Sequence, residues 1–202
     1  MATELFFIYD SHCPWSYATT PLVQAISDAF PEIELHLWHC ARYEGDEQIA
    51  TKTLEQVEQY SNITFTAEYK DQRITAADST IAANLLSWVS NKIPTNALPL
   101  LKAIQQQHFE QGNTLKTASD FDDIIEEFKL SAPAKVLKND KFTKDAEHVF
   151  AYIEEIQDVI NTQAIPALLL GVNDNLVLLN HNLYLEKPSE IINAVKLELE
   201  KS

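Results

Sequence analysis

The sequence predicts an α/β fold in which a βαβ unit near the N-terminus and a β-hairpin with a helix near the C-terminus flank a long helical segment. Three patterns support this prediction: short apolar runs before residue 40, helical spacing of apolar residues from 47 to 162, and two β-rich runs after Pro166. The chain has 202 residues, of which 46% are hydrophobic. This length and composition suit one large domain or a domain with a substantial insertion.

The βαβ unit begins with residues 5–9, a short and continuously apolar run that is typical of a buried strand. A helix-like run follows at residues 17–30. Residues 33–39 then alternate between two faces, as expected for a second strand. Because a helix joins the two strands, we expect a right-handed parallel crossover with both strands ending at one edge of the sheet.

Residues 47–162 predict a bundle of four to six helices, because apolar residues recur there at helical spacing. Helix-breaking residues at 91–94, 112–113 and 131–133 separate the helices, and residues 117–120 supply a start signal. Acidic residues beside the apolar stripes predict a solvated face. We therefore expect a helical insertion domain at 47–162 between the two parts, 1–46 and 163–202, of one α/β domain.

The C-terminal part predicts a hairpin followed by a helix. Residues 167–172 and 176–179 are β-rich runs joined by turn residues at 173–175. Residues 189–201 have the pattern of an amphipathic helix, with Pro188 at its start.

The composition excludes several classes of function. Thirty acidic residues against fifteen basic ones give a net charge of −15, which disfavours nucleic acid and anionic membrane surfaces as partners. The chain has only three glycines and no Gly-rich phosphate-binding motif. No apolar run approaches the roughly 20 residues of a membrane span, and the N-terminal run is too short for a secretory signal. With two cysteines, the chain is expected to be cytoplasmic, with reduced thiols.

The most informative motif is Cys13-Pro14-Trp15-Ser16, which lies between the first strand and the first helix. At a helix start, unpaired backbone N–H groups and the helix dipole favour a thiolate, so we expect the pKa of Cys13 to lie below its free value of about 8.5. Pro14 suits the first helical position, where its missing N–H would have no partner. The alternative for Cys13 is a small buried hydrophobic residue.

Ser16 stands where the redox motif Cys-x-x-Cys has its second thiol. Cys13 is therefore able to attack a disulfide but unable to close an internal one with residue 16. A hydroxyl three positions after Cys13 lies on the same helix face and is suited to donate a hydrogen bond to the thiolate.

Residues 9–17, followed by Thr20-Pro21-Leu22, resemble the strand, active-site turn and first helix of the DsbA-like branch of the thioredoxin superfamily. This branch includes FrnE-type disulfide isomerases, 2-hydroxychromene-2-carboxylate isomerases and kappa-class glutathione transferases. Residues 164–167 are similar to the cis-proline loop that faces the active-site cysteine in thioredoxin-like proteins. The resemblance implies a thioredoxin-like fold with a large all-helical insertion.

The resemblance also implies residues that bind the substrate. The Ile165-Pro166 bond would be cis and present the Ile165 backbone to an extended peptide or to glutathione. From the local sequence alone, an ordinary turn proline with a trans bond is an open alternative. Pro14 and Trp15 would lie near the same substrate.

Two further residues have two interpretations each. His12 either polarises the Cys13 sulfur when charged or is an exposed turn histidine. Cys40, after His39 at the end of the second strand, either resolves a mixed disulfide at Cys13 or lies outside the roughly 7 Å that a disulfide allows between Cα atoms. The two His-Cys pairs offer zinc ligands, but adjacent strand residues point to opposite faces, so no metal is expected.

The sequence therefore predicts a thiol-disulfide oxidoreductase or isomerase of DsbA-like type. The Cys13 thiolate would form mixed disulfides with protein or glutathione substrates, and an external thiol such as glutathione would resolve them. No permanently bound cofactor is expected, and glutathione would be a co-substrate. Two alternatives remain: a glutathione-dependent isomerase or transferase, whose relatives carry serine at the position of Cys13, and a redox-inactive peptide-binding module.

Overall fold

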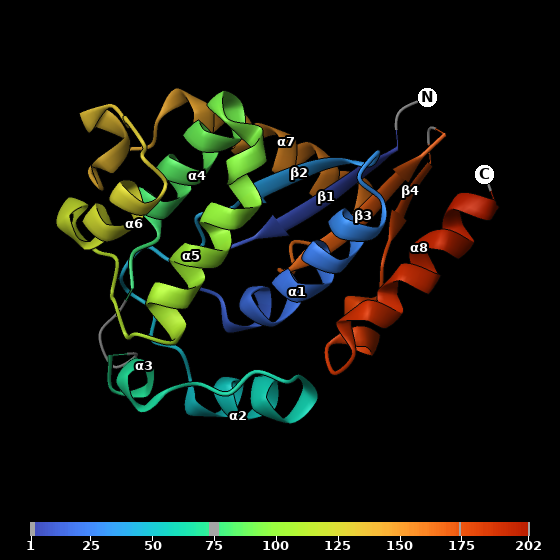
Figure 1. The fold of residues 1–202 in the computed structure, drawn as a ribbon, viewed down its shortest axis with the longest axis horizontal. Coiled ribbons are helices and arrows are strands. Elements are labelled where there is room, and N and C mark those ends of the chain that lie inside the picture. The colour runs from blue at the N-terminus through green and yellow to red at the C-terminus, as the bar shows by residue number, and fades with distance from the viewer. Residues whose placement is uncertain (1–2, 73–76, 174, 202) are drawn as a thin grey trace.

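The computed structural model describes residues 3–72, 77–173 and 175–201, and shows a four-stranded mixed sheet with helices on both faces (Figure 1). The strands lie in the order β2-β1-β3-β4. Their bounds are Glu4–Tyr9 for β1, Glu34–His39 for β2, Ala167–Val172 for β3 and Asn175–Leu178 for β4. Asp174, in the predicted hairpin turn, lies outside the described residues.

The register places three chain segments at one edge of the sheet. β1 and β2 are parallel, with Tyr9 opposite His39. β3 runs antiparallel to β1 and pairs Ala167 with Ile8, so β3 begins where β1 ends. The predicted βαβ unit and C-terminal hairpin are confirmed, and the residues that follow β1 and β2 lie near those that precede β3.

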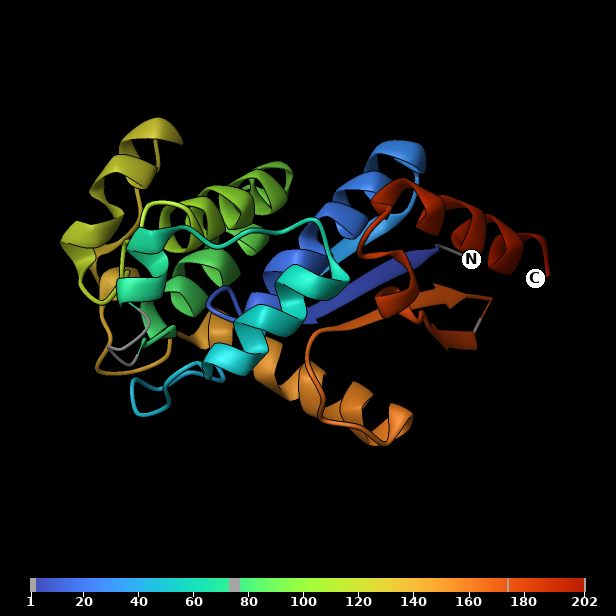
Figure 2. The same cartoon turned by 90° about the horizontal axis from the view of Figure 1, so that it is seen from below.

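Helices cover both faces of the sheet, which explains why β1 is apolar from Leu5 to Tyr9. Figure 2 shows α1 (Pro14–Ala29) and α8 (Ile191–Glu200) on one side of the sheet and α7 (Lys144–Ile160) on the other. Leu5, Phe7 and Tyr9 therefore enter the larger core with α1. Phe6 and Ile8 enter a smaller core on the α7 face.

The described part of residues 47–162 contains six α-helices, as the spacing of apolar residues predicts. They are α2 (Thr51–Tyr60), α3 (Ala67–Gln72), α4 (Thr80–Lys92), α5 (Ala97–Phe109), α6 (Asp122–Glu127) and α7. The start signal at residues 117–120 forms a capping box between Thr117 and Asp120. Short 3-10 turns lie at Pro94–Asn96, Ala118–Phe121, Ala134–Leu137, His181–Tyr184 and Pro188–Glu190.

The helical segment shares its core with the sheet. Leu85 of α4 and Leu101 and Ile104 of α5 belong to the same buried cluster as β1 and α1. α7 contacts both α4 and β2, and so links the other helices to the sheet. The exact division into two domains at residues 47 and 162 stays a prediction.

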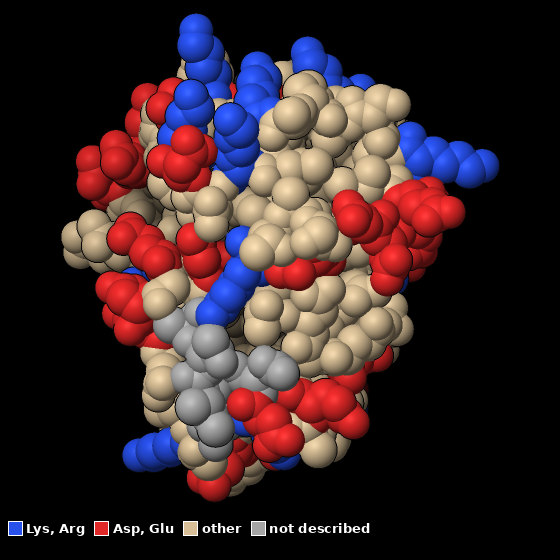
Figure 3. Space-filling model, turned by 90° about the vertical axis from the view of Figure 1, so that its left-hand side faces the viewer, with Lys and Arg blue, Asp and Glu red and all other residues tan. Residues whose placement is uncertain are grey.

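Charged side chains are distributed unevenly on the end of the molecule that α3 and α6 form. Acidic side chains are spread over this face, while basic side chains gather mainly along its upper edge (Figure 3). Within the described ranges, no helix combines the length and apolar character needed to cross a bilayer.

Candidate active site

Cys13 lies at the sheet edge where β1 and β2 end, directly before α1. It is the N-cap residue of that helix, with extended backbone angles, and Pro14 occupies the first helical position. The Cys13 N–H donates to the Asp10 carbonyl at 3.1 Å, and the Tyr17 N–H donates to the Cys13 carbonyl at 2.9 Å. The predicted place of the motif at a helix start is therefore confirmed, with Pro14 itself buried.

Three groups hydrogen-bond to the Cys13 sulfur and favour its thiolate. They are the Ser16 hydroxyl and the backbone N–H groups of Ser16 and Trp15, and each lowers the pKa of Cys13. The Ser16 oxygen accepts a hydrogen bond from the Asp10 N–H at 3.4 Å, which leaves its own proton free to point at sulfur. Ser16 is thus placed for the auxiliary role that its spacing suggests.

Burial nevertheless outweighs these donors. Cys13 is only 5% exposed, and this burial raises the pKa of its thiol above the ordinary value; the negative charge of Asp10 raises it further. The predicted lowering of the Cys13 pKa is therefore wrong for this conformation, because the helix-start donors do not compensate for desolvation. Access of water to the sulfur would therefore favour the thiolate.

Tyr43, in the segment after β2, is a further partner of Cys13. Its hydroxyl hydrogen-bonds to the Cys13 sulfur, and its own pKa is raised, chiefly by burial and then by the charge of Cys13. The Tyr43 N–H donates to Asp10 Oδ2 at 3.3 Å, which fixes the segment over the active-site turn. Tyr43 therefore offers the sulfur a proton donor.

Tyr43→Phe is expected to slow alkylation of Cys13 by iodoacetamide about tenfold at a given pH, because a hydrogen bond to a thiolate is worth more than 1 kcal/mol (about 1.5–3). The rate should be measured against pH in a Cys40→Ser background, so that only one thiol reacts. Tyr152→Phe is the matched control, since Tyr152 is exposed on α7. An unchanged alkylation profile would show that the Tyr43 hydroxyl does not stabilise the thiolate.

Asp10 is a fully buried carboxylate that joins three segments of the chain. Its Oδ1 accepts from the His12 N–H at 2.8 Å. Its Oδ2 accepts from the Arg42 N–H at 2.7 Å and from the Ser79 hydroxyl at 2.8 Å. Asp10 thus holds together the active-site turn, the segment after β2 and the start of α4.

Three buried histidines surround this carboxylate: His12, His39 and His108. The Ser11 hydroxyl bridges His39 Nε2 at 2.8 Å and His12 Nδ1 at 2.9 Å. The Ser11 and Ala41 N–H groups face the two ring nitrogens of His39, each at 3.0 Å. An imidazolium has no lone pair to accept such a bond, so His39 is held in its neutral form.

His12 is buried, so its interpretation as an exposed turn histidine is wrong, and burial disfavours the charged form that polarising the Cys13 sulfur would require. It is 1% exposed, and burial, followed by the nearby His39, lowers its pKa to about 3. Its ring lies 4.3 Å from the ring of His108, which α5 supplies. His12 is therefore a member of a packed cluster in which burial favours the neutral imidazole.

These histidines predict a loss of stability in mild acid. Burial lowers the pKa of His12, His39 and His108 in the folded state, while the unfolded state keeps a value of about 6.5. The contribution of these histidines to the free energy of unfolding is therefore fully present above about pH 6.5. It is lost as the pH decreases toward the folded-state pKa, because the unfolded chain then binds more protons than the folded chain. At pH 5, His12 alone should cost about 2 kcal/mol.

Urea unfolding at about pH 7.5, about pH 6 and about pH 5 measures this effect. His148→Gln, at an exposed position, should leave the pH dependence unchanged. Equal unfolding free energies across this range would contradict the neutral buried cluster.

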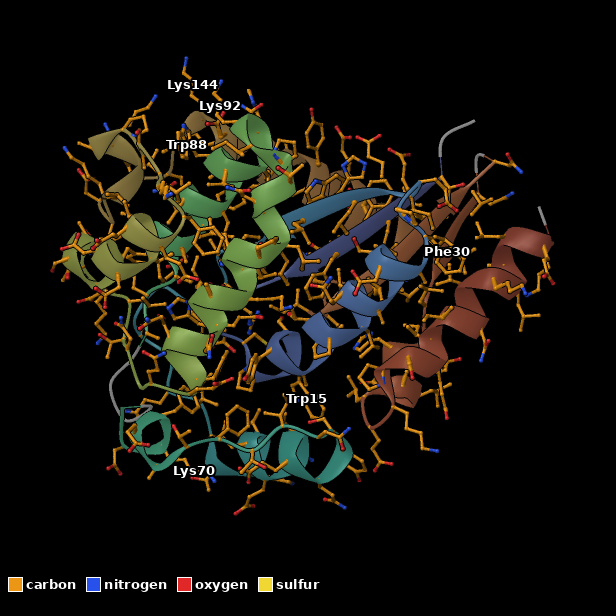
Figure 4. All side chains as sticks on the ribbon, in the orientation of Figure 1. Trp15, Phe30, Lys70, Trp88, Lys92 and Lys144 are labelled. Carbon is orange, nitrogen blue, oxygen red and sulfur yellow. The ribbon has the colours of Figure 1, made fainter. Side chains whose placement is uncertain are left out.

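A groove of about 520 Å³ brings together three of the four residues predicted to bind substrate. The Ile165-Pro166 bond is cis, as the resemblance implies. Trp15 points from the start of α1 toward α2 (Figure 4). This cis-proline groove is lined by Trp15, Tyr60, Ala164, Ile165, Pro166, His181, Asn182 and Leu185.

Cys40 lies in a second groove, of about 410 Å³, on the other side of Ile165. Its side chain packs with the smaller core on the α7 face, whereas the neighbouring His39 ring contacts Tyr9 in the larger core. Both cysteines are free thiols, and burial, followed by the Asp10 charge, raises the pKa of Cys40. The two thiols thus face different surroundings although their strands end at one edge.

The candidate metal ligands lie elsewhere. In the described ranges, the group of three side chains with ligand atoms close enough for an ion is Glu4, Glu34 and His36. It lies at the opposite end of β1 and β2 from Cys13. There His36 Nε2 is 3.0 Å from Glu4 Oε1, within hydrogen-bond distance, and 3.8 Å from Glu34 Oε1.

Sequence reasoning missed Asp10, Tyr43 and His108 as members of the site. Asp10 follows β1 directly, so a polar residue at the strand end was an available signal. Tyr43 follows β2 at the same sheet edge, which offers a weaker signal. His108 comes from α5, far along the chain, and no local pattern distinguishes it.

Comparison with known proteins supports the fold assignment. A scan against models of known families finds no match, and a search of curated proteins finds no similar sequence. Among solved structures, the cytosolic disulfide reductase DsbM from Pseudomonas aeruginosa matches with a TM-score of 0.82 at 17% identity, covering 98% of this chain and 100% of that one. The same protein solved with GSH matches with a TM-score of 0.78 at 17% identity, covering 98% and 99%.

A structure described as a putative protein disulfide isomerase from Nitrosomonas europaea matches with a TM-score of 0.74 at 14% identity. The match covers 100% of this chain and 99% of that chain. At these identities the likeness establishes the fold alone. The chain thus has the DsbA-like form of the thioredoxin fold, with its predicted helical insertion.

Proposed function

We propose that the protein is a thiol-disulfide oxidoreductase that uses one reactive thiol, Cys13, together with an external thiol such as glutathione. The observation that carries this proposal is the position of Ser16. Its buried hydroxyl hydrogen-bonds to the Cys13 sulfur, where a second redox cysteine would otherwise lie. A resolving thiol must therefore come from elsewhere.

The chemistry requires two exchange steps. The Cys13 thiolate attacks a glutathionylated thiol, takes glutathione as a mixed disulfide and releases the substrate as a thiolate. A glutathione thiolate then attacks this mixed disulfide, which yields oxidised glutathione and regenerates Cys13. Cys40 is a weak competitor for the second step, because burial raises its pKa and it lies outside the cis-proline groove.

The cis-proline groove supports binding of an extended substrate. Its apolar residues Trp15, Pro166 and Leu185 lie beside the helix start that carries Cys13. Exposed main chain before β3 is suited to strand-like pairing, which selects little for sequence. Free thiols and the fold likeness to a cytosolic reductase support a role in a reducing compartment such as the cytoplasm.

The raised pKa of Cys13 favours a second candidate, a redox-inactive module that binds peptides in the same groove. A glutathione-dependent isomerase or transferase is a third, in which glutathione would bind without a bond to Cys13. These candidates differ in whether a covalent adduct forms.

Mass spectrometry after exposure to oxidised glutathione distinguishes them. The proposal expects one glutathione on Cys13 in the wild type and in Cys40→Ser, and none at that position in Cys13→Ser. Reversible glutathione binding without an adduct would support the isomerase or transferase. Peptide binding with neither adduct nor glutathione binding would support the module.

A further inference from the structure

Three metal-ligating side chains gather on the α7 face of the sheet, at the end opposite Cys13. They are Glu4 at the start of β1, and Glu34 and His36 at the start of β2. The His36 ring stacks on Phe6, which enters the smaller core on the α7 face. Glu4 and Glu34 lie two residues before Phe6 and His36 on their strands, so they project from the same face.

The separations between the ligand atoms suit one shared metal ion. His36 Nε2 lies 3.0 Å from Glu4 Oε1 and 3.8 Å from Glu34 Oε1, and ligand atoms of all three residues lie within 4.8 Å of one another. Zinc binds imidazole nitrogen and carboxylate oxygen at about 2.1 Å, which places the ligand atoms of a tetrahedral ion about 3.4 Å apart. Small rotations of the carboxylates therefore bring the three atoms around one ion.

The two carboxylates are incompletely neutralised by the protein itself. Glu4 and Glu34 are opposite each other on neighbouring strands, where like charges repel. Within the ranges that the structure describes, His36 is the only basic side chain at ion-pair distance from either one. Its Nε2 carries at most one proton, which reaches Glu4 at 3.0 Å but leaves Glu34 beyond hydrogen-bond distance at 3.8 Å. A divalent ion would bind both carboxylates and the Nε2 lone pair together.

The imidazole is held in place, while the three side chains stay open to water. The His36 and Phe6 ring centroids are 4.8 Å apart with 12° between the planes, and the Trp38 ring lies 5.9 Å from that of His36. The His36, Glu4 and Glu34 side chains are 24%, 39% and 65% exposed. An ion is therefore able to reach all three, and water to complete its coordination. The imidazole ligand favours zinc over magnesium or calcium.

We propose that Glu4, Glu34 and His36 form a zinc site, with water as the fourth ligand. The bound ion links the first residues of β1 and β2, and so stabilises the strand pair at this end of the sheet. The site is separate from the two His-Cys pairs, for which no metal is expected, and it uses no thiol. It is therefore testable independently of the proposed redox function.

Calorimetric titration of the full chain with zinc chloride tests the proposal. The parent protein for this experiment is the Cys13→Ser/Cys40→Ser variant, which removes both thiols as competing ligands. One zinc ion per chain is expected to bind, and zinc should raise the unfolding temperature. Glu4→Gln, Glu34→Gln and His36→Gln should each weaken zinc binding at least about tenfold, because loss of even a supporting residue costs a metal site about 10–100-fold in affinity.

Two substitutions of the same kinds at exposed positions on helices are the matched controls. Glu55→Gln on α2 and His148→Gln on α7 should bind zinc as the parent does. Absence of saturable zinc binding would overturn the proposal. Unchanged binding in any of the three ligand variants would also overturn it.

A second comparison distinguishes loss of the metal from damage to the fold. Without zinc, Glu34→Gln should unfold at the same temperature as the parent or higher, because it removes the repulsion between neighbouring carboxylates. With saturating zinc, the parent should unfold at the higher temperature, because only it retains all three ligands. An equal rise in unfolding temperature with zinc in both proteins would contradict the site.

Discussion

Ser16→Cys is expected to form a disulfide with Cys13 under mild oxidation and to raise the rate of insulin reduction by at least about tenfold. The Ser16 hydroxyl already hydrogen-bonds to the Cys13 sulfur, so a side chain at position 16 points at the reacting atom. Residues three apart at a helix start lie close enough for a disulfide. An intramolecular thiol then resolves the mixed disulfide without waiting for glutathione.

Mass spectrometry of the oxidised variant would show the loss of two hydrogens and a peptide cross-link between positions 13 and 16. Ser16→Ala is the matched control; it lacks both the hydroxyl and a thiol, and should reduce insulin no faster than the wild type. If the introduced thiol stays free while Cys13 is glutathionylated, the helix-start geometry assigned to the motif is incorrect.

Asp10→Asn is expected to destabilise the fold by about 3 kcal/mol and yet to make Cys13 more reactive. The Asp10 carboxylate accepts hydrogen bonds from His12, Arg42 and Ser79, and an amide NH₂ group would face some of these donors. Removing the charge also removes one cause of the raised Cys13 pKa. The substitution is therefore expected to lower the stability of the fold and to raise the reactivity of Cys13.

Urea unfolding and iodoacetamide alkylation of the same preparation measure both effects. Asp122→Asn, on the exposed side of α6, should alter neither. A change in stability within about 0.5 kcal/mol, or slower alkylation of Cys13, would contradict the role assigned to Asp10.

The parts of the fold that local patterns determine were predictable. The apolar run of β1 and the alternation of β2 reflect which faces of each strand are buried. The turn residues before β4 mark the end of the hairpin's first strand. The start of α1 follows from Cys13 and Pro14, whose backbone preferences are local. The cis bond at Pro166 required the resemblance, since the sequence around it also suits an ordinary turn.

The environment of Cys13 was not predictable in the same way, because residues distant in the chain create it. Tyr43 reaches the sulfur from the segment after β2, and α5 supplies His108 against His12. The desolvation that raises the Cys13 pKa is a property of this assembly. Helix-start electrostatics, which the sequence does reveal, account for only part of the balance.

Cys40 illustrates the same limit. Its place after β2 indicates nearness to the active-site edge, but not that its side chain packs on the α7 face while the His39 ring packs in the larger core. Alternation along a strand predicts that neighbours point apart; it does not predict which groove each one lines.

The release of glutathione from the Cys13 mixed disulfide tests the central claim most directly. The purified adduct should be stable after removal of free thiols, and added glutathione should release it as oxidised glutathione at the same rate in the wild type and in Cys40→Ser. Release without added thiol, accompanied by a disulfide between Cys13 and Cys40 and absent in Cys40→Ser, would contradict the single-thiol mechanism.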